Sequence, residues 1–199
     1  MAMPNMVPQM WTAEMARRLL PDDGNRYEVI DGVLHVTPSP GMPHQSVGGR
    51  LYRRLAHYLE QFGQADTLMY SPADISWTTH TLVQPDLFMV RREDLSIGQW
   101  KAVKHLLLAV EILSPSSRRR DLVIKRDLYR RYGVEEYWVG DARARTIHVW
   151  RPSDREGTVV SDTLTWRPSS APPDAAALRL DVAALFRDLP ASEADDEEE

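Results

Sequence analysis

The sequence predicts an α/β (α+β) fold in which a central mixed β-sheet is flanked by helices, and three observations support this. Apolar residues recur at helical spacing over residues 44–62 and 121–132. Short apolar runs bounded by Gly, Pro, Asp or Ser lie between and after these segments, as expected of strands. The order of the two kinds of element along one chain favours helices packed on a mixed sheet.

Length and composition predict a globular chain with one substantial core. The chain has 199 residues, of which 43% are apolar and 27% are charged, and these proportions are ordinary for a soluble domain. We therefore expect a single domain over residues 1–192, followed by an acidic tail at residues 193–199.

The first half of the chain predicts a helix, a hairpin, a second helix and two strands. Thr12 is the expected N-cap of the first helix. Asp31 and Gly32 are the expected hairpin turn, because this dipeptide tolerates the positive φ angles of a two-residue turn. The expected bounds are 11–20 for the first helix, 27–30 and 33–36 for the hairpin strands, 44–62 for the long helix, and 69–77 and 82–90 for the two strands.

The second half supplies the most apolar strand and the helix that follows it. Residues 106–113 form an apolar run interrupted by a single acid, which is typical of a buried strand. Asp121 is suited to cap the next helix, and Gly133 is expected to end it. The expected bounds are 106–113 for the strand, 121–132 for the helix, 136–140 and 146–150 for two further strands, and 182–187 for a short helix after an irregular, proline-containing segment.

Residue types and segments that the sequence lacks narrow the class of protein. There is no cysteine, which excludes disulfides, thiolate metal sites and cysteine nucleophiles. No segment is apolar over the length needed to span a bilayer, and the N-terminus lacks the basic and then apolar layout of a secretory signal. We therefore expect a cytoplasmic protein with no membrane partner.

Charge is distributed unevenly along the chain. Six of the last seven residues are acidic, and without them the formal charge of −5 becomes +1. This run is most simply a solvating tail, although it is also suited to shield a basic site. Residues 118–131 hold seven bases and two acids. The arginines here are candidates for contacts with nucleic-acid phosphates, against the alternative of a solvated helix face: Arg118, Arg119, Arg120, Arg126 and Arg130.

Two carboxylates occupy apolar runs, where a soluble protein seldom leaves a charge unpaired. Asp86 follows Pro85 in one predicted strand, and Glu111 interrupts the buried strand. At helical spacing, Lys125 falls near the centre of the apolar stripe of the helix that follows Glu111, so these two side chains are expected to meet. A structural ion pair is the alternative to a functional role.

Two neighbouring carboxylates and an ammonium group suit metal-dependent chemistry. Carboxylates held close together repel one another unless a proton or a cation neutralises them. Oxygen ligands suit hard ions such as Mg²⁺ or Mn²⁺, and such an ion activates water and neutralises charge on a phosphoryl group. Asp86, Glu111 and Lys125 therefore predict phosphodiester hydrolysis, with all three as catalytic residues.

Several segments resemble a known family. Pro85-Asp86 followed by Glu111 on a later strand is similar to the PD-(D/E)XK nuclease superfamily, and the chain resembles in particular a large bacterial family of restriction-endonuclease-like proteins. One position departs from the superfamily pattern, because Leu113 stands where a lysine is expected. In some branches that lysine has migrated to the neighbouring helix, where this chain has Lys125. The resemblance is carried by residues 26–32, 44–45, 84–86 and 110–116, by Asp121, Lys125 and Tyr129, and by residues 132–138.

The resemblance implies a restriction-endonuclease-like fold, a divalent-metal site and often a homodimer. Asp86 and Glu111 would hold Mg²⁺ or Mn²⁺, with the backbone carbonyl of Ile112 as a further ligand. Lys125 would orient a water molecule or stabilise charge in the transition state.

Four further residues are candidates for auxiliary roles. Glu28 occupies a hairpin position where we expect a solvent-exposed side chain. His44 and Gln45 begin the long helix. The His44 ring is suited to touch phosphate or relay a proton, although a solvent-facing ring is the simpler expectation. Tyr129 lies one turn beyond Lys125 and either bonds to the site or packs in the core.

These observations together predict a metal-dependent endonuclease that acts on nucleic acid, with DNA the expected substrate. A rival hypothesis is a catalytically inactive, dimeric nuclease-fold protein that binds nucleic acid or regulates another process. Leu113 and the acidic tail favour this rival, whereas the intact catalytic trio favours the enzyme. A hydrolase of small phosphoesters is a third alternative and requires a closed pocket.

Overall fold

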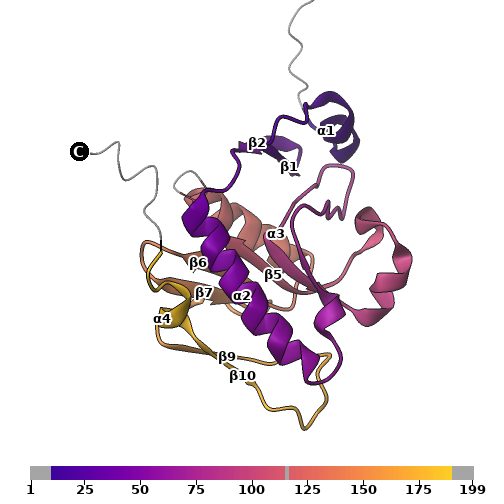
Figure 1. Cartoon of the computed structure of the whole chain (residues 1–199). Helices are drawn as coiled ribbons and strands as arrows, with labels where there is room; N and C mark the ends of the chain where they lie inside the picture. Colours follow the sequence, from indigo (N-terminus) through magenta and orange to yellow (C-terminus); the bar gives the residue numbers. More distant parts are fainter. Residues whose placement is uncertain (1–9, 115–116, 190–199) are drawn as a thin grey trace, which may run out of the picture.

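A six-stranded mixed β-sheet forms the centre of the molecule (Figure 1). The computed structural model describes residues 10–114 and 117–189. Neighbouring strands follow the order β3-β4-β5-β6-β7-β8 and pair antiparallel, except for the parallel pair β5 and β6. The strands are β3 Leu68–Tyr70, β4 Leu87–Val90, β5 Leu106–Ile112, β6 Tyr137–Asp141, β7 Thr146–Trp150 and β8 Thr158–Val160.

Helices cover both faces of this sheet. Successive strand residues point to opposite sides, and since the strands are apolar, each face needs a covering layer. Helix α2, Met42–Glu60, packs on the face that carries Met89. Helix α3, Arg126–Arg131, is preceded by a π-helical segment, Arg120–Lys125, and packs on the face that carries Phe88. The predicted central mixed sheet flanked by helices is therefore confirmed.

The predicted hairpin forms a separate two-stranded sheet beside the central one (Figure 1). Asp31 and Gly32 make its turn with φ angles of 51° and 82°, as the Asp-Gly dipeptide predicts. Paired backbone hydrogen bonds between Val29 and Leu82 attach the hairpin to the segment that leads into β4. The two strands are β1 Arg26–Ile30 and β2 Val33–Thr37.

Short helices complete the fold. Thr12 caps the first of them, since its side chain accepts a hydrogen bond from the backbone N–H of Met15, as predicted. No helix in the parts of the chain that the structure describes is long and apolar enough to cross a membrane. The short helices are α1 Ala13–Leu19, α4 Val182–Leu185, and the 3₁₀ turns η1 Ala65–Thr67, η2 Arg92–Ile97 and η3 Trp100–Ala102.

Two predicted strands are shorter than their apolar patterns suggest. The strand predicted at 69–77 ends at Tyr70, and the strand predicted at 82–90 begins only at Leu87. A proline interrupts each segment, and proline has no N–H to donate to a neighbouring strand. Asp86 consequently lies just before β4, at its N-terminal end.

The prediction of irregular structure after residue 150 is wrong. Strand β8 extends the sheet, and strands β9 and β10 form an antiparallel pair. Each has only three or four residues, which is too short for an alternating pattern to be distinguished from a loop. Their bounds are β9 Thr163–Trp166 and β10 Leu178–Asp181.

The predicted limits of the domain and the predicted acidic tail lie outside the residues that the structure describes. The single-domain organisation over residues 1–192 therefore stays a prediction.

Candidate active site

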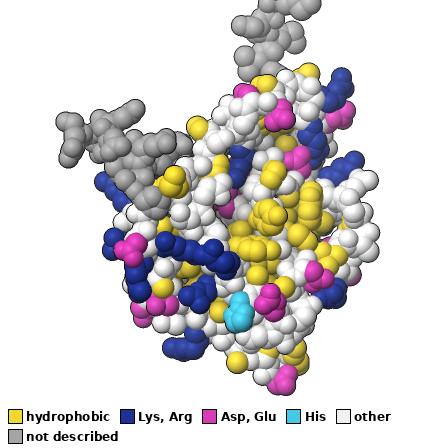
Figure 2. All heavy atoms as spheres, in the orientation of Figure 1, with side chains coloured by type: hydrophobic (Ala, Val, Ile, Leu, Met, Phe, Trp, Pro, Cys, Tyr) yellow, Lys and Arg dark blue, Asp and Glu magenta, His cyan; other side chains and the backbone are white. Residues whose placement is uncertain are grey.

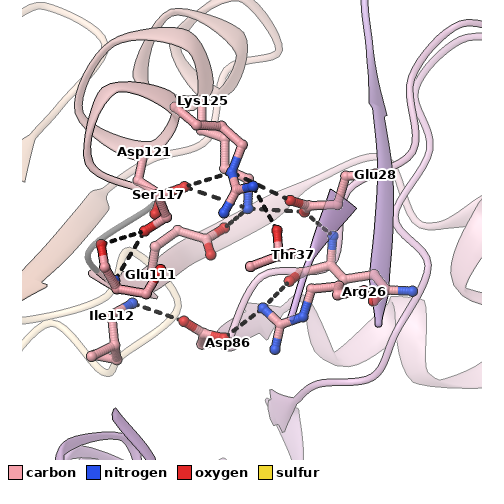
Figure 3. Close-up of polar contacts among 12 residues, drawn as sticks. Arg26, Glu28, Thr37, Asp86, Glu111, Ile112, Ser117, Asp121 and Lys125 are labelled. Atoms are coloured by element: carbon pink, nitrogen blue, oxygen red, sulfur yellow. Dashed lines mark hydrogen bonds and ion pairs between the residues drawn. The ribbon is translucent and has the colours of Figure 1, made fainter. Parts of the chain in front are cut away.

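Asp86 lies next to β4 and Glu111 lies in β5, which pairs antiparallel with β4; Figure 3 shows both side chains. Asp86 directly precedes β4, and Glu111 is the penultimate residue of β5, beside that end of β4 because Leu87 pairs with Val110. Lys125 ends the π-helical segment that follows β5. All three side chains are buried. The fold thus brings the three predicted catalytic residues into one buried region.

The Lys125 ammonium group lies between buried carboxylates. Its Nζ is 2.9 Å from Glu111 Oε1, 2.9 Å from Glu28 Oε1 and 3.8 Å from Asp121 Oδ1. Burial alone lowers the pKa of Lys125, but these carboxylates outweigh that effect and raise the pKa above its ordinary value. Lys125 is therefore charged, and it meets Glu111 as its position in the apolar stripe predicts.

Glu111 carries an elevated pKa. Burial raises the pKa of this carboxyl group; Lys125 opposes the increase, while the charges of Asp86, Asp121 and Glu28 add to it. The net result is a pKa of about 8, against an ordinary value of 4.5. The hydroxyl of Tyr129 also donates a hydrogen bond of 2.9 Å to Glu111 Oε1, so Tyr129 both packs in the core and bonds to the site.

The buried groups around Lys125 include more acidic side chains than basic ones. Three carboxylates, those of Glu28, Glu111 and Asp121, face two cations, Lys125 and Arg120. We call these five residues the buried carboxylate cluster. Glu28 Oε2 is buried and makes no hydrogen bond within the described residues. When Glu111 is ionised, one further proton or cation is needed to balance the cluster, and this imbalance adds to the effect of burial in raising the pKa of Glu111.

The elevated pKa of Glu111 predicts a pH dependence of stability. Because the folded-state pKa of about 8 exceeds the ordinary 4.5, the folded protein retains a proton that the unfolded chain releases between these values. The stabilisation is complete below about pH 4.5 and is lost as the pH rises through about 8. We expect Glu111→Gln to gain stability relative to the wild type between pH 5 and pH 9. Thermal unfolding of both proteins over this range tests it, and a constant difference in Tm would contradict it.

Asp86 is held by donors from three elements. Arg26 of β1 donates a hydrogen bond to its Oδ1 at 2.7 Å. The backbone N–H of Ile112 donates to its Oδ2 at 2.8 Å, and His44 Nε2 is 3.0 Å from the same oxygen. Burial raises the pKa of Asp86, but His44, Arg26 and the Ile112 amide outweigh it and bring the pKa below its ordinary value. Asp86 is therefore ionised. The contact made by Ile112 uses its N–H, whereas the predicted metal ligand is its carbonyl.

Three sequence-based expectations about individual side chains are wrong. Glu28 was expected to be exposed, but it is fully buried, forms an ion pair with Lys125 and accepts a hydrogen bond from the backbone N–H of Gln84. The His44 ring does not face solvent freely, since it is 15% exposed and contacts Asp86. Asp121 does not act as a simple helix cap, because its carboxylate points to the buried cluster. Tertiary neighbours decide all three positions.

The five arginines of the predicted phosphate-binding patch do not share one environment. Arg120 is 12% exposed and joins the buried carboxylate cluster, and its Nη1 donates to Thr37 Oγ1 at 2.6 Å. Arg118 pairs with Asp141 at 2.5 Å. The remaining three lie on the outer side of the helix, half-buried or exposed: Arg119, Arg126 and Arg130. The prediction of a common arginine surface is therefore wrong for Arg120.

A cavity of about 800 Å³ lies beside Asp86, and we call it the α2 groove. Of the three predicted catalytic residues, only Asp86 lines it. On the face that carries α2, apolar side chains gather in the middle, with Lys and Arg side chains to one side (Figure 2). The residues of α2 that line the groove are His44, Gln45, Gly48, Gly49 and Tyr52, and further walls come from residues 24–26, 39–40 and 70–72.

Sequence reasoning missed Arg26 and underrated Asp121. Arg26 begins β1 and reaches both Asp86 and the backbone carbonyl of Gln84. An arginine at the start of a hairpin strand carries no signal of such a contact, because the contact depends on docking of the hairpin. Asp121 precedes Lys125 by four residues, and the helical period does place both on one face, but the role expected of Asp121 was that of a helix cap.

The donor set is compatible in chemistry with a hard divalent cation. The carboxylates of Asp86, Glu111 and Glu28 supply oxygen ligands, and the buried carboxylate cluster has more acidic side chains than basic ones. Within residues 10–114 and 117–189, however, no three His, Cys, Asp or Glu side chains are grouped closely enough to form a ready metal site. Binding an ion therefore requires Asp86 or Glu111 to exchange some of its present hydrogen-bond donors.

Comparisons with known proteins identify the fold and the family of this chain. A solved structure has the same fold: the crystal structure of a putative nuclease belonging to DUF820 from Anabaena variabilis matches with a TM-score of 0.67 and 19% identity, over 84% of this chain and 93% of that one. Residues 13–185 match the model of the Uma2 family, described as "Putative restriction endonuclease", and the chain belongs to this family. No curated protein matches the sequence.

Proposed function

We propose that this protein is a metal-dependent endonuclease that hydrolyses phosphodiester bonds in nucleic acid, with DNA as the expected substrate. The observation that carries the proposal is the excess of buried acidic side chains over basic ones around Lys125, beside the ends of two adjacent strands. The description of the family and the fold shared with the structure titled a putative nuclease from Anabaena variabilis support it. In this proposal Lys125 fills the role of the PD-(D/E)XK lysine from the neighbouring helix.

The proposed cofactor is Mg²⁺ or Mn²⁺. Asp86 and Glu111 would hold it, with the Ile112 carbonyl as a further ligand. When bound, the ion lowers the pKa of a water molecule and neutralises charge that develops on the phosphoryl group.

Lys125 has two carboxylate partners, so it stays in place for catalysis even if Glu111 leaves it to bind a cation. Its ammonium group contacts Glu28 and Glu111 at equal distances of 2.9 Å. If Glu111 turns to a cation, Glu28 still anchors Lys125 and keeps it charged. We assign Lys125 the stabilisation of negative charge on the phosphate, and we assign Glu28 the positioning of Lys125.

Arg26 and His44 are the cationic or proton-carrying groups on the groove side of the site. Both line the α2 groove, and both contact Asp86. We assign Arg26 a contact with the phosphate next to the cleaved bond, and His44 either the same contact or relay of a proton to the leaving oxygen. Gln45, also in the wall, is suited to hydrogen-bond to the nucleotide. Tyr129 positions Glu111 through its hydroxyl group.

Mn²⁺ binding measured by calorimetry tests the proposed site before any substrate is chosen. We expect Asp86→Asn and Glu111→Gln to lose binding, while Asp74→Asn, which alters an ion-paired carboxylate bonded to Arg17, retains it. Because Glu111 must lose its proton to bind a cation, affinity should rise with pH up to about 8 and then level off. Titrations in buffers of different ionisation enthalpy should show a proton released below that pH.

Binding of Mn²⁺ that survives both substitutions would place the ion elsewhere and contradict the proposed ligands. The titration should be repeated with inorganic phosphate present, because phosphate oxygens of a substrate can supply ligands that the protein lacks. Loss of Mn²⁺ binding in Asp74→Asn as well would indicate a general loss of structure, which the Tm of each variant detects.

A second candidate function is a nuclease-fold protein without turnover that binds nucleic acid. One observation favours it: both oxygens of Asp86 already accept hydrogen bonds from protein donors, and Ile112 occupies one of them with its amide. Wild-type protein that binds DNA or RNA with Mg²⁺ or Mn²⁺ present, without cleaving either, would establish this alternative. The homodimer and the cytoplasmic location stay predictions, and sedimentation or light scattering tests the former.

A further inference from the structure

The α2 groove ends beside an exposed aromatic ring. Tyr70, the last residue of β3, lines the groove and is 65% exposed. Tyr52 of α2 contacts it edge-to-face, with ring centroids 5.6 Å apart and ring planes at 86°. This contact positions the Tyr70 ring while most of its surface stays accessible. Such a ring is suited to stack with a planar group.

The wall between the two ends of the groove is bare helix backbone. Gly48 and Gly49 line the groove, and a Cβ atom at either position would meet nothing within 4 Å besides the adjacent residues and the backbone of the helix itself. Packing inside the chain therefore does not require glycine here, although glycine inside a helix is destabilising relative to alanine. The open backbone leaves space for a group that lies directly against α2.

The length of this wall corresponds to a short stretch of polynucleotide. His44, which contacts Asp86, and Tyr52, which contacts Tyr70, lie about 12 Å apart along the helix axis at the standard rise per residue. At the roughly 3.4 Å spacing of stacked nucleotides, this distance spans about three to four nucleotides.

The charges and the aromatic ring favour a single strand over a duplex. Two basic residues that line the groove, Arg26 and His44, are offset by two acidic ones, Asp22 and Asp86. The net attraction to phosphates is therefore weak, and stacking must contribute to affinity. The bases of a duplex are stacked on one another, whereas an unpaired base has a free face. We propose that the α2 groove binds a single-stranded segment of nucleic acid, with one base stacked on Tyr70 about three to four nucleotides from the bond held at Asp86. This rests on the proposed function, because Asp86 is taken as the reacting end.

Fluorescence anisotropy with labelled 12-nucleotide oligo(dT), oligo(rU) and a 12-base-pair duplex tests the inference. The measurements are made in EDTA, so that affinity is recorded without cleavage. We expect at least one single strand to bind more tightly than the duplex. Tyr70→Ala should weaken that binding by about 5- to 150-fold, which is the range for losing one stacked base. Tyr70→Phe should retain the affinity of the wild type, because phenylalanine keeps the aromatic ring. Val159→Ala is the matched control, because Val159 is also exposed but lies in β8, at the opposite edge of the sheet.

Tighter binding of the duplex, no binding of either single strand, or equal affinity of Tyr70→Ala and wild type would overturn the inference. Gly48→Leu provides a second variant, which adds a side chain to the wall of the groove and leaves Tyr70 itself unchanged. It should weaken single-strand binding at least tenfold without lowering the Tm, and unchanged affinity would also overturn the inference.

Cleavage is measured separately with Mg²⁺ and Mn²⁺, so the two proposals can fail independently. Single-strand binding that depends on Tyr70, without cleavage by the wild type, supports the inference and contradicts the nuclease function. Cleavage that is lost in Asp86→Asn but indifferent to Tyr70 supports the nuclease function and contradicts the inference.

Discussion

Replacement of Lys125 by methionine is expected to lower the free energy of unfolding by about 3–5 kcal/mol, the range for removing one partner of a buried ion pair. Lys125 is 1% exposed and lies within 2.9 Å of both Glu28 and Glu111. Methionine keeps most of the volume of the side chain but leaves three buried carboxylates with Arg120 alone. Chemical denaturation at about pH 9, above the pKa of about 8 of Glu111, measures the loss.

Arg126→Met is the matched control for this change. Arg126 follows Lys125 directly and pairs with Asp127 at 2.8 Å, but its side chain is 33% exposed. Exposed pairs contribute little, so we expect a change of about 0.5 kcal/mol or less. A loss below about 1 kcal/mol in Lys125→Met would mean that the carboxylates are already protonated and that Lys125 does not balance them. Adding Glu111→Gln to Lys125→Met should recover part of the stability, because it removes one of the unbalanced charges.

Asp86→Asn is expected to reduce nuclease activity by about 10³-fold, since it removes the carboxylate that faces both the groove and the proposed metal. The substitution preserves the size of the side chain. It leaves Arg26 without its anionic partner at 2.7 Å, so a modest loss of stability accompanies the loss of activity. Cleavage of a labelled oligonucleotide with Mg²⁺ or Mn²⁺, below the Tm of the variant, measures the effect.

Asp74→Asn distinguishes a catalytic effect from a structural one. Asp74 is paired with Arg17 at 2.8 Å and accepts a hydrogen bond from Gln84, but it does not line the α2 groove. Its replacement should leave the cleavage rate within about twofold, because an exposed ion pair contributes at most about 1 kcal/mol. Activity in Asp86→Asn equal to that of Asp74→Asn would remove Asp86 from the proposed mechanism.

The pattern of the sequence predicted much of the central sheet. The apolar run of β5 and the period of the helix after it placed Glu111 and Lys125 on facing surfaces, and the structure brings their side chains to 2.9 Å. The Asp-Gly turn and the Thr12 cap were predicted because both depend on local backbone geometry. The strands β8, β9 and β10 were missed because each is too short to show a period.

The residues of the candidate site likewise fall into those that the sequence could predict and those that it could not. Residues that depend on one element and its immediate neighbour, such as Glu111, Lys125 and Tyr129, could be predicted from periodicity. Residues that reach the site by docking of the hairpin could not. Glu28 was expected to be exposed and Arg26 was not considered, yet both contact the central residues.

By itself, the sequence determined which side chains are available for chemistry and which lie on the apolar faces of β5 and the helix after it. The tertiary structure decided that Glu28 is buried, that Arg26 and His44 hold Asp86, and that the groove runs along α2. The physical reason is range. Strand and helix periods act over a few residues, whereas the contact between Arg26 and Asp86 joins positions 60 residues apart and exists only once the hairpin packs against the sheet.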